Sequence, residues 1–247
     1  MPVTGKVHYL APSDLSYLYD RCPRCYWLKL RGLKAPGDQM PGVFRDIDRA
    51  QKSGISLDAI RLLGIPAAEF IPREKVTSDP AEYGGVLLSI SGFTDRRVRL
   101  DDGTVGILDY KTSHPRPDSM ARFWRAMSAY QHGVEHCPTP EQVTLLALVV
   151  FSPLKFQLRQ GASVQAYYMG DLLRIDIEQD RAKFEKLLEG VGKMLSSDEM
   201  PPSGSCDVCR HADAVVGMRM NKLLDQITAD AELGPDIAAK IAARIKL

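Results

Sequence analysis

The chain has 247 residues, and its hydrophobic content of 45% is enough for the core of one large domain or two small ones. With 32 basic and 31 acidic residues the formal net charge is +1, which excludes the strong overall basic charge of a tight non-specific nucleic-acid binder but leaves room for a local basic groove. No stretch approaches the roughly 18 consecutive apolar residues of a membrane span, and MPVTGKVHYL has no signal-peptide apolar run, so we expect a cytoplasmic protein without a membrane partner.

The N-terminal third is predicted to be mainly helical. A first helix is expected to begin at Pro12-Ser13-Asp14, where a side chain can cap it, with an apolar stripe of Leu15, Leu18 and Tyr19. The other expected elements are helical segments at residues 26–30, 44–53 and 57–64, a loop at 34–42, and β segments at 70–76 and 86–91.

A β-hairpin is predicted in the middle of the chain. Two apolar-rich segments, residues 92–100 and 104–111, flank Asp101-Asp102-Gly103. This is the composition of a three-residue hairpin loop, in which a type I turn ends at a glycine in the left-handed conformation. Such a loop pairs Leu100 with Thr104 and fixes the register of both strands.

In this register Asp95 lies opposite Asp109. Because side chains alternate along a strand, Lys111 shares the face of Asp109, and Tyr110 points the other way. Two neighbouring carboxylates repel each other unless a hard cation such as Mg²⁺ lies between them. The three residues therefore suit metal-assisted phosphodiester hydrolysis, with Lys111 orienting water or stabilising charge on phosphorus. The alternative is an Asp–Lys pair on a solvated sheet face, without a function.

The C-terminal half is predicted to alternate helices and strands. The expected elements are a helix at 117–136, a strongly apolar strand at 143–151, strands at 165–168 and 172–177, a helix at 180–195, and helical sequence from 212 to the end with a break at 234–235. A helix between the hairpin and the apolar strand is the connection that parallel strands require. We therefore expect an α/β fold with a central mixed sheet and helices on both faces.

Four of the five cysteines form two C-x-x-C pairs, Cys22 with Cys25 and Cys206 with Cys209. This spacing lets two thiolates bind one metal, and such pairs fit metal ligation in a reducing compartment better than a disulfide framework. Together the pairs can hold Zn²⁺ or a [4Fe–4S] cluster and join the two ends of the chain. The alternative is that the four cysteines are buried as small apolar side chains.

The fifth cysteine, Cys137, follows His132 and His136, which are four residues apart. These three residues offer a second candidate metal site, whereas a helix end rich in polar residues accounts for them without a metal. His211, close to Cys209, is an alternative ligand for the thiolate site.

Two segments resemble a known family. Asp95 followed by Asp109-Tyr110-Lys111 resembles the PD-(D/E)xK nuclease signature, with Thr94 where the name's proline would stand. LSYLYDRCPRCYWLKLRG resembles the N-terminal segment of the RecB-like branch, which includes CRISPR-associated adaptation nucleases and AddB-type helicase–nuclease subunits. In those relatives a C-P-R element supplies one ligand of an iron–sulfur cluster. The resemblance covers most of residues 10–215.

The resemblance implies a restriction-endonuclease-like core in a single nuclease domain, residues 1–247. Its segments would be a catalytic core at 86–177, metal- or cluster-binding segments at 1–33 and 197–215, and C-terminal helices at 216–247. Relatives contribute one upstream and three downstream cysteines, and here Val215 takes the place of the last while Cys25 restores the count. The family favours a [4Fe–4S] cluster over Zn²⁺.

The resemblance also assigns roles in the active site. Asp95 and Asp109 would bind Mg²⁺ or Mn²⁺, helped by the carbonyl of Tyr110. Asp48, with Asp46 behind it, would replace the metal-binding histidine or acid of relatives. Gln131 stands where relatives have a glutamine that contacts the site, although their tyrosine four residues later is Glu135 here.

The expected function is therefore a metal-dependent nuclease that hydrolyses DNA, acting on single-stranded segments or ends. A helicase, an integrase or a phage or defence complex is the kind of partner the family implies. Two alternatives remain: a catalytically silent DNA-binding or assembly module with a structural four-cysteine site, and a metal-stapled interaction protein without a role in nucleic-acid chemistry.

Overall fold

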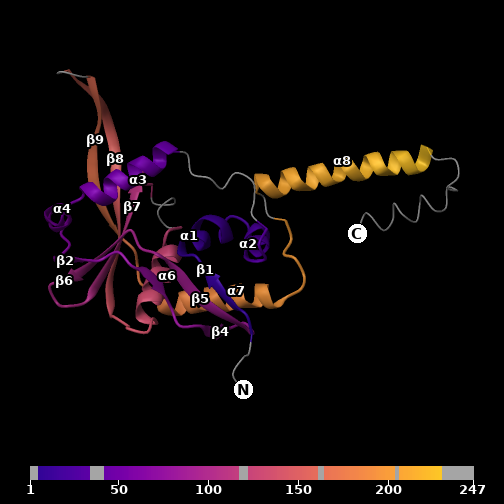
Figure 1. Cartoon of the computed structure of the whole chain (residues 1–247), viewed down its shortest axis with the longest axis horizontal. Coiled ribbons are helices and arrows are strands. Elements are labelled where there is room, and N and C mark those ends of the chain that lie inside the picture. Colours follow the sequence, from indigo (N-terminus) through magenta and orange to yellow (C-terminus); the bar gives the residue numbers. More distant parts are fainter. Residues whose placement is uncertain (1–4, 34–41, 117–121, 161–163, 204–205, 230–247) are drawn as a thin grey trace. The chain divides into compact units, whose positions relative to one another are not determined.

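The computed structural model describes residues 5–33, 42–116, 122–160, 164–203 and 206–229 (Figure 1). The chain divides into two units, Met1–Pro201 and Pro202–Leu247. The first unit contains two β-sheets and their helices, and the second contains helix α8 (Asp207–Ala229). None of the helices in these described ranges is long and apolar enough to cross a membrane.

The larger sheet of the first unit has the strand order β2-β6-β7-β8-β9. Its strands are β2 (Ala67–Ile71), β6 (Arg96–Leu100), β7 (Val105–Thr112), β8 (Val143–Gln160) and β9 (Val164–Asp176). Strands β7 and β8 run parallel, and the other neighbours run antiparallel. Helix α6 (Trp124–Glu135) lies between β7 and β8 in the chain. The predicted mixed sheet and its helical crossover are thus confirmed.

The hairpin β6–β7 has the predicted loop and register. The N–H of Leu100 donates to the Thr104 carbonyl at 2.9 Å, and Gly103 has a φ of +83°. Arg96 pairs with Leu108, so the residue before β6, Asp95, falls opposite Asp109. The left-handed glycine therefore sets the register on which the candidate site depends.

A second, smaller sheet was not foreseen. It consists of β1 (Val7–Leu10), β3 (Lys75–Thr77), β4 (Ala81–Tyr83) and β5 (Val86–Phe93), with β1, β3 and β4 all pairing with β5. The prediction of one strand over residues 92–100 is wrong, because the chain leaves the small sheet after Phe93 and enters the large one at Arg96. The predicted strand 70–76 likewise splits into β2 and β3 around Pro72, which has no N–H for a sheet.

The helices of the first unit agree with the prediction in type but not at every boundary. They are α1 (Pro12–Asp14), a π-helical turn η1 (Leu15–Tyr19), α2 (Pro23–Leu30), α3 (Gly42–Gly54), α4 (Leu57–Leu62), α6 and α7 (Arg181–Ser196). The N-cap of α1 is Ala11, and no side chain caps the helix, so the predicted polar cap is wrong.

Elements of the C-terminal half are longer than predicted or begin elsewhere. Strand β8 continues beyond residue 151, and the two strands predicted at 165–168 and 172–177 form the single strand β9. Helix α8 begins at Asp207 instead of residue 212. Most of the predicted loop at 34–42, residues 117–121 of the predicted 117–136 helix and the break at 234–235 lie outside the described residues.

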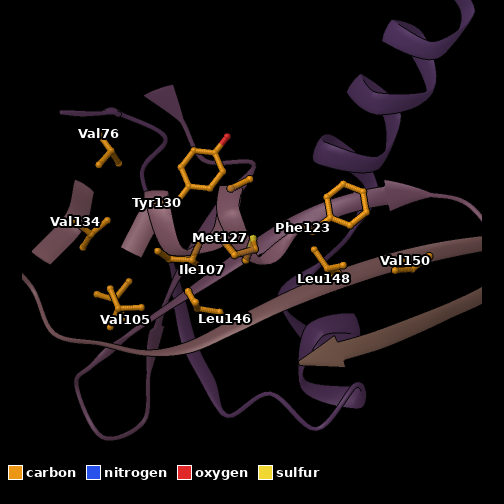
Figure 2. Close-up of a cluster of buried hydrophobic side chains, with 12 residues drawn as sticks. Val76, Val105, Ile107, Phe123, Met127, Tyr130, Val134, Leu146, Leu148 and Val150 are labelled. Carbon is orange, nitrogen blue, oxygen red and sulfur yellow. The ribbon is translucent and has the colours of Figure 1, made fainter. Parts of the chain in front are cut away.

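Helices cover both faces of the large sheet, as predicted. On one face, Ile107 of β7 and Leu146 of β8 pack against Met127 of α6 in a buried cluster (Figure 2). On the opposite face, Leu108 packs in a cluster that includes Ile60 of α4. A third cluster joins the small sheet to the N-terminal helices and α7. This alternation along β7 determines which side chains reach the candidate site.

Candidate active site

Two carboxyl groups and a lysine meet at the start of β6 and the end of β7. The Oδ2 atom of Asp95 accepts a hydrogen bond from the backbone N–H of Tyr110 at 3.0 Å. The side chain of Asp109 contacts that of Asp95 by a hydrogen bond and forms an ion pair with Lys111. The side chain of Tyr110 packs in the cluster on the other face of the sheet, as predicted.

The contact with Tyr110 also explains the break between β5 and β6. Asp95 lies just outside β6, and its carboxylate accepts the N–H that a backbone carbonyl would accept in a regular ladder. The Asp95 side chain thus replaces a backbone contact just before β6 begins, and the same bond holds it beside Asp109.

Burial dominates the electrostatics of Asp109, whose exposed fraction is 6%. Burial and the charge of Asp95 raise the pKa of Asp109 to about 7, against the opposing effect of Lys111. Burial also disfavours ionisation of Asp95, but Lys52, Lys111 and the N–H of Tyr110 together hold its pKa below the ordinary value. The surroundings thus favour the ionised form of Asp95 and disfavour that of Asp109.

The carboxylate oxygens of Asp95 and Asp109 are suitable ligands for a divalent cation. Asp95 and Asp109 offer hard oxygen ligands in direct contact, and a proton now relieves part of their repulsion. A hard divalent cation relieves the same repulsion and prefers such ligands. The structure thus brings together the two side chains for which metal binding is predicted.

The raised pKa of Asp109 predicts a pH-dependent stability. The folded protein holds a proton on Asp109 up to about pH 7, whereas the unfolded chain loses it near 3.8. Between these values the folded state binds more protons, so this group lowers the unfolding free energy as pH rises, by about 4 kcal/mol in total. Asp109→Asn should remove this decrease. Urea denaturation from pH 4 to 8, in buffer without divalent cations, measures it.

A suitable control for that experiment is Asp46→Asn, because the side chain of Asp46 is 71% exposed and pairs loosely with Arg49 at 3.5 Å. The control should keep the wild-type pH profile. Parallel profiles for wild type and Asp109→Asn would contradict the assignment of a buried protonated carboxyl to Asp109.

Lys52 of α3 is part of the site and was not foreseen. Its Nζ atom lies 2.7 Å from Asp95 Oδ1 and 2.7 Å from Asp48 Oδ2. Burial opposes its charge, but the two carboxylates raise the pKa of Lys52 above the ordinary value. The predicted ligand Asp48 is thus linked to Asp95 through an ammonium group. The only sequence signal is that Lys52 follows Asp48 by one helical turn.

Aromatic side chains surround Lys111. Its Nζ atom lies 5.1 Å from the centre of the Phe123 ring, which packs edge-to-face with Tyr17 of η1 at 5.8 Å. Burial disfavours the ammonium, but the charge of Asp109 outweighs burial and raises the pKa of Lys111. Lys111 is therefore a charged and mostly buried group between the carboxyls and an aromatic ring, where its interactions are stronger than in water.

Tyr130 of helix α6 lies close enough to the acidic pair for the charges of Asp109 and Asp95 to act on its hydroxyl, and the role predicted for its neighbour Gln131 stays a prediction. Burial, followed by the charges of Asp109 and Asp95, raises the pKa of Tyr130. Gln131 is only 2% exposed, but its amide donates to Glu135 at 3.2 Å and to Gln179 at 2.8 Å. In Figure 2 the hydroxyl of Tyr130 points out of the apolar cluster. From the sequence, Tyr130 is expected only to lie on the predicted helix at 117–136.

A basic cleft of about 440 Å³ opens beside Asp95. Its acidic lining residues are Asp48 and Asp95, and its cationic lining residues are Arg45, Arg49, Lys52, Arg73 and Arg96. Cations outnumber acids around the cleft, although the chain as a whole is almost neutral. The cleft is the kind of local basic surface that attracts phosphate groups.

Each cysteine pair begins a helix in the same way. In the first unit, Cys22 is the N-cap of α2, and its Sγ accepts the N–H of Cys25 at 3.5 Å. In the second unit, the Sγ of Cys206 accepts the N–H of Cys209 at 3.4 Å at the start of α8. All four are buried and form no disulfide. The two pairs therefore have the same local geometry at the start of a helix, with the first sulfur of each pair bonded to the N–H of the second cysteine.

Comparisons with known proteins identify the family. The profile described as PD-(D/E)XK nuclease superfamily matches residues 38–214, well over half of the 247 residues. A solved structure titled "Crystal structure of SSO0001" is similar with a TM-score of 0.43 and 17% identity, over 80% of this chain and 81% of that one. No match was found among curated proteins. The family match spans Asp95, Asp109 and Lys111, and the chain therefore belongs to the PD-(D/E)XK nuclease superfamily.

Proposed function

We propose that this protein is a metal-dependent nuclease that hydrolyses phosphodiester bonds in DNA. The observation that supports the proposal most directly is the contact between Asp95 and Asp109 beside Lys111, in a chain of this superfamily. The resemblance of the N-terminal segment supports the finer assignment to the RecB-like branch. It also supports single-stranded DNA or DNA ends as substrate and a helicase, integrase or phage or defence complex as partner.

Asp95 and Asp109, with the carbonyl of Tyr110, would hold Mg²⁺ or Mn²⁺. The bound cation would polarise the scissile phosphate and lower the pKa of a bound water. Lys111 is paired with Asp109 and would orient the attacking water or stabilise negative charge at phosphorus. Asp48 would position Lys52, which lies between it and Asp95.

Two adjacent residues of α6, Tyr130 and Gln131, are candidates for the contact with substrate or water. Gln131 has to exchange its bonds to Glu135 and Gln179 before its amide can take that role. Tyr130 already lies where the charges of the acidic pair act on its hydroxyl. We therefore assign Tyr130 the contact in the substrate-free protein.

The basic cleft supports a nucleic-acid substrate. Replacing both Arg45 and Arg49 with glutamine should weaken DNA binding in Ca²⁺. The salt slope, which is the steepness with which the logarithm of the binding constant falls with the logarithm of the salt concentration, should decrease by about two if each arginine contacts one phosphate. The rate at saturating DNA should change little. Lys186→Gln/Lys193→Gln on α7, which lines no part of this cleft, is the matched control. Equal salt slopes for both double variants would contradict binding in the cleft.

The two cysteine pairs would bind one [4Fe–4S] cluster or, alternatively, one Zn²⁺ ion. Four buried thiols with the same local geometry, in two C-x-x-C pairs, support this proposal. Iron–sulfur clusters give the protein visible absorbance, whereas a zinc-loaded preparation is colourless. Metal analysis and the absorption spectrum of the purified protein distinguish the two.

One feature favours a silent DNA-binding module as the second candidate. Lys52 and Lys111 each form an ion pair with a carboxylate of the site and so neutralise it without a metal. Cleavage of end-labelled single-stranded DNA, double-stranded DNA and RNA with Mg²⁺ or Mn²⁺ tests both candidates. The proposed function predicts cation-dependent products from DNA. DNA retention at low salt without any cleavage would favour the silent module.

A further inference from the structure

We propose that His132, His136 and Glu185 form a second metal site, which takes a transition-metal ion such as Zn²⁺ and is separate from the acidic pair. One nitrogen of each histidine and one oxygen of the glutamate all lie within 4.8 Å of one another. The two rings stack with centres 4.1 Å apart, and His132 Nδ1 lies 3.4 Å from Glu185 Oε1. A small movement of the side chains would bring all three donors onto one ion.

Two helices of the first unit supply these donors. His132 lies on α6, and His136, four residues later, is the residue that caps the C-terminus of this helix. A spacing of four residues directs two imidazoles to one side of a helix. Glu185 projects from α7, whose contact with α6 is part of the folded unit. A metal ion here would fasten α6 to α7, and α6 also carries Tyr130 toward the acidic pair.

The surrounding groups already orient the ligands. His136 Nδ1 lies 3.0 Å from the carbonyl of His132, so Nδ1 carries the proton and Nε2 is available to a metal. Glu185 is hydrogen-bonded to the hydroxyl of Tyr83. Metal sites in proteins commonly hold their histidines and carboxylates by such outer contacts.

The adjoining pocket has about 120 Å³, enough for an ion with a water molecule. Glu135 also lines it but is bound by Arg181, with Arg181 Nε 2.9 Å from Glu135 Oε2. That pairing leaves Glu185 as the acidic ligand. His132 is buried, Glu185 is half-buried and His136 is exposed, so the site is open to solvent on the side of His136.

The donor set determines the class of metal. Two imidazoles and one carboxylate suit Zn²⁺, Co²⁺, Ni²⁺ or Fe²⁺, whereas Mg²⁺ prefers oxygen ligands alone. Cys137 is not part of this set. Its Sγ contacts the carbonyl oxygens of Val134 at 3.3 Å and Thr139 at 3.1 Å. The site therefore differs in chemistry both from the acidic pair and from the thiolate pairs.

Titration of the full chain with Co²⁺, followed by absorption spectroscopy and calorimetry, tests the proposal. The protein is used with its cysteine pairs already loaded and with Mg²⁺ in excess for the acidic pair, so that neither of these sites takes up cobalt. Wild type should then bind one equivalent of Co²⁺ with the weak d–d bands of nitrogen and oxygen ligands, and the titration should add no thiolate charge-transfer bands. His136→Gln and Glu185→Gln should each reduce the affinity for this equivalent at least about 100-fold, and His8→Gln should bind as wild type does. Melting temperatures without added metal check that each variant is folded.

Two results would overturn the proposal. One is the absence of a cobalt equivalent with nitrogen and oxygen ligands in the wild-type protein. The other is equal cobalt affinity in folded His136→Gln, folded Glu185→Gln and the His8→Gln control. Neither result depends on nuclease activity, so the second site and the proposed function are tested separately.

Discussion

Asp109→Asn should reduce cation-dependent DNA cleavage by at least about a thousandfold. The substitution keeps the shape of the side chain but removes one of two carboxyls in contact at the site. It also removes the partner of Lys111, which then loses the charge that holds it in place. Initial rates of cleavage of end-labelled DNA in Mg²⁺, at saturating enzyme, measure the effect.

The same variant should remain folded, and this separates lost chemistry from lost structure. Asparagine carries no charge, so Asp109→Asn should be more stable than wild type at pH 8, where burial of the ionised Asp109 is unfavourable. Asp101→Asn, in the exposed hairpin loop, is the control and should cleave as wild type does. A stable Asp109→Asn protein with undiminished cleavage would rule out the proposed mechanism.

Cys206→Ser/Cys209→Ser should release the metal or cluster completely. Four-thiolate zinc sites supply an apparent binding free energy of roughly 10 kcal/mol, most of which is lost when two ligands are removed. Cys22→Ser/Cys25→Ser should have the same effect, because one metal cannot remain on two thiolates. Metal content and urea denaturation of purified variants measure both losses.

A thermodynamic cycle then tests whether the two pairs share one metal. If they do, the quadruple variant should be no less stable than either double variant, since the metal is already gone. If each pair acts alone, the losses should add. Cys137→Ser, at a partly exposed cysteine, should leave metal content unchanged. Full metal retention in either double variant would contradict a shared site.

The geometry of the acidic pair could be predicted because it depends on local rules. The Asp101-Asp102-Gly103 loop fixes the hairpin register, and alternation along a strand then fixes which side chains share a face. Both steps involve residues close in sequence. The structure accordingly has Asp95 in contact with Asp109 and the Tyr110 side chain on the other face.

The charged groups around that pair could not be predicted in the same way. Lys52 reaches Asp95 because α3 packs against β7, a contact between segments more than fifty residues apart in the chain. Nothing in the sequence near Lys52 indicates that packing. The basic cleft has the same origin, since its arginines come from α3, from the segment before β3 and from β6.

The difference between Gln131 and Tyr130 has another cause. Adjacent helical residues point about 100° apart, so neighbouring residues of α6 meet different groups. Gln131 then faces Gln179 and Glu135, whereas Tyr130 faces the acidic pair. Helical periodicity alone could not resolve this, because both residues are buried.

The central claim is that Asp95 and Asp109 bind one divalent cation together. Anomalous diffraction from crystals soaked in Mn²⁺ tests it directly. We predict a manganese peak within about 2.2 Å of an oxygen atom from each carboxylate. Ion pairs of Lys52 with Asp95 and of Lys111 with Asp109 that persist at saturating Mn²⁺, with no manganese between the two carboxylates, would contradict the account.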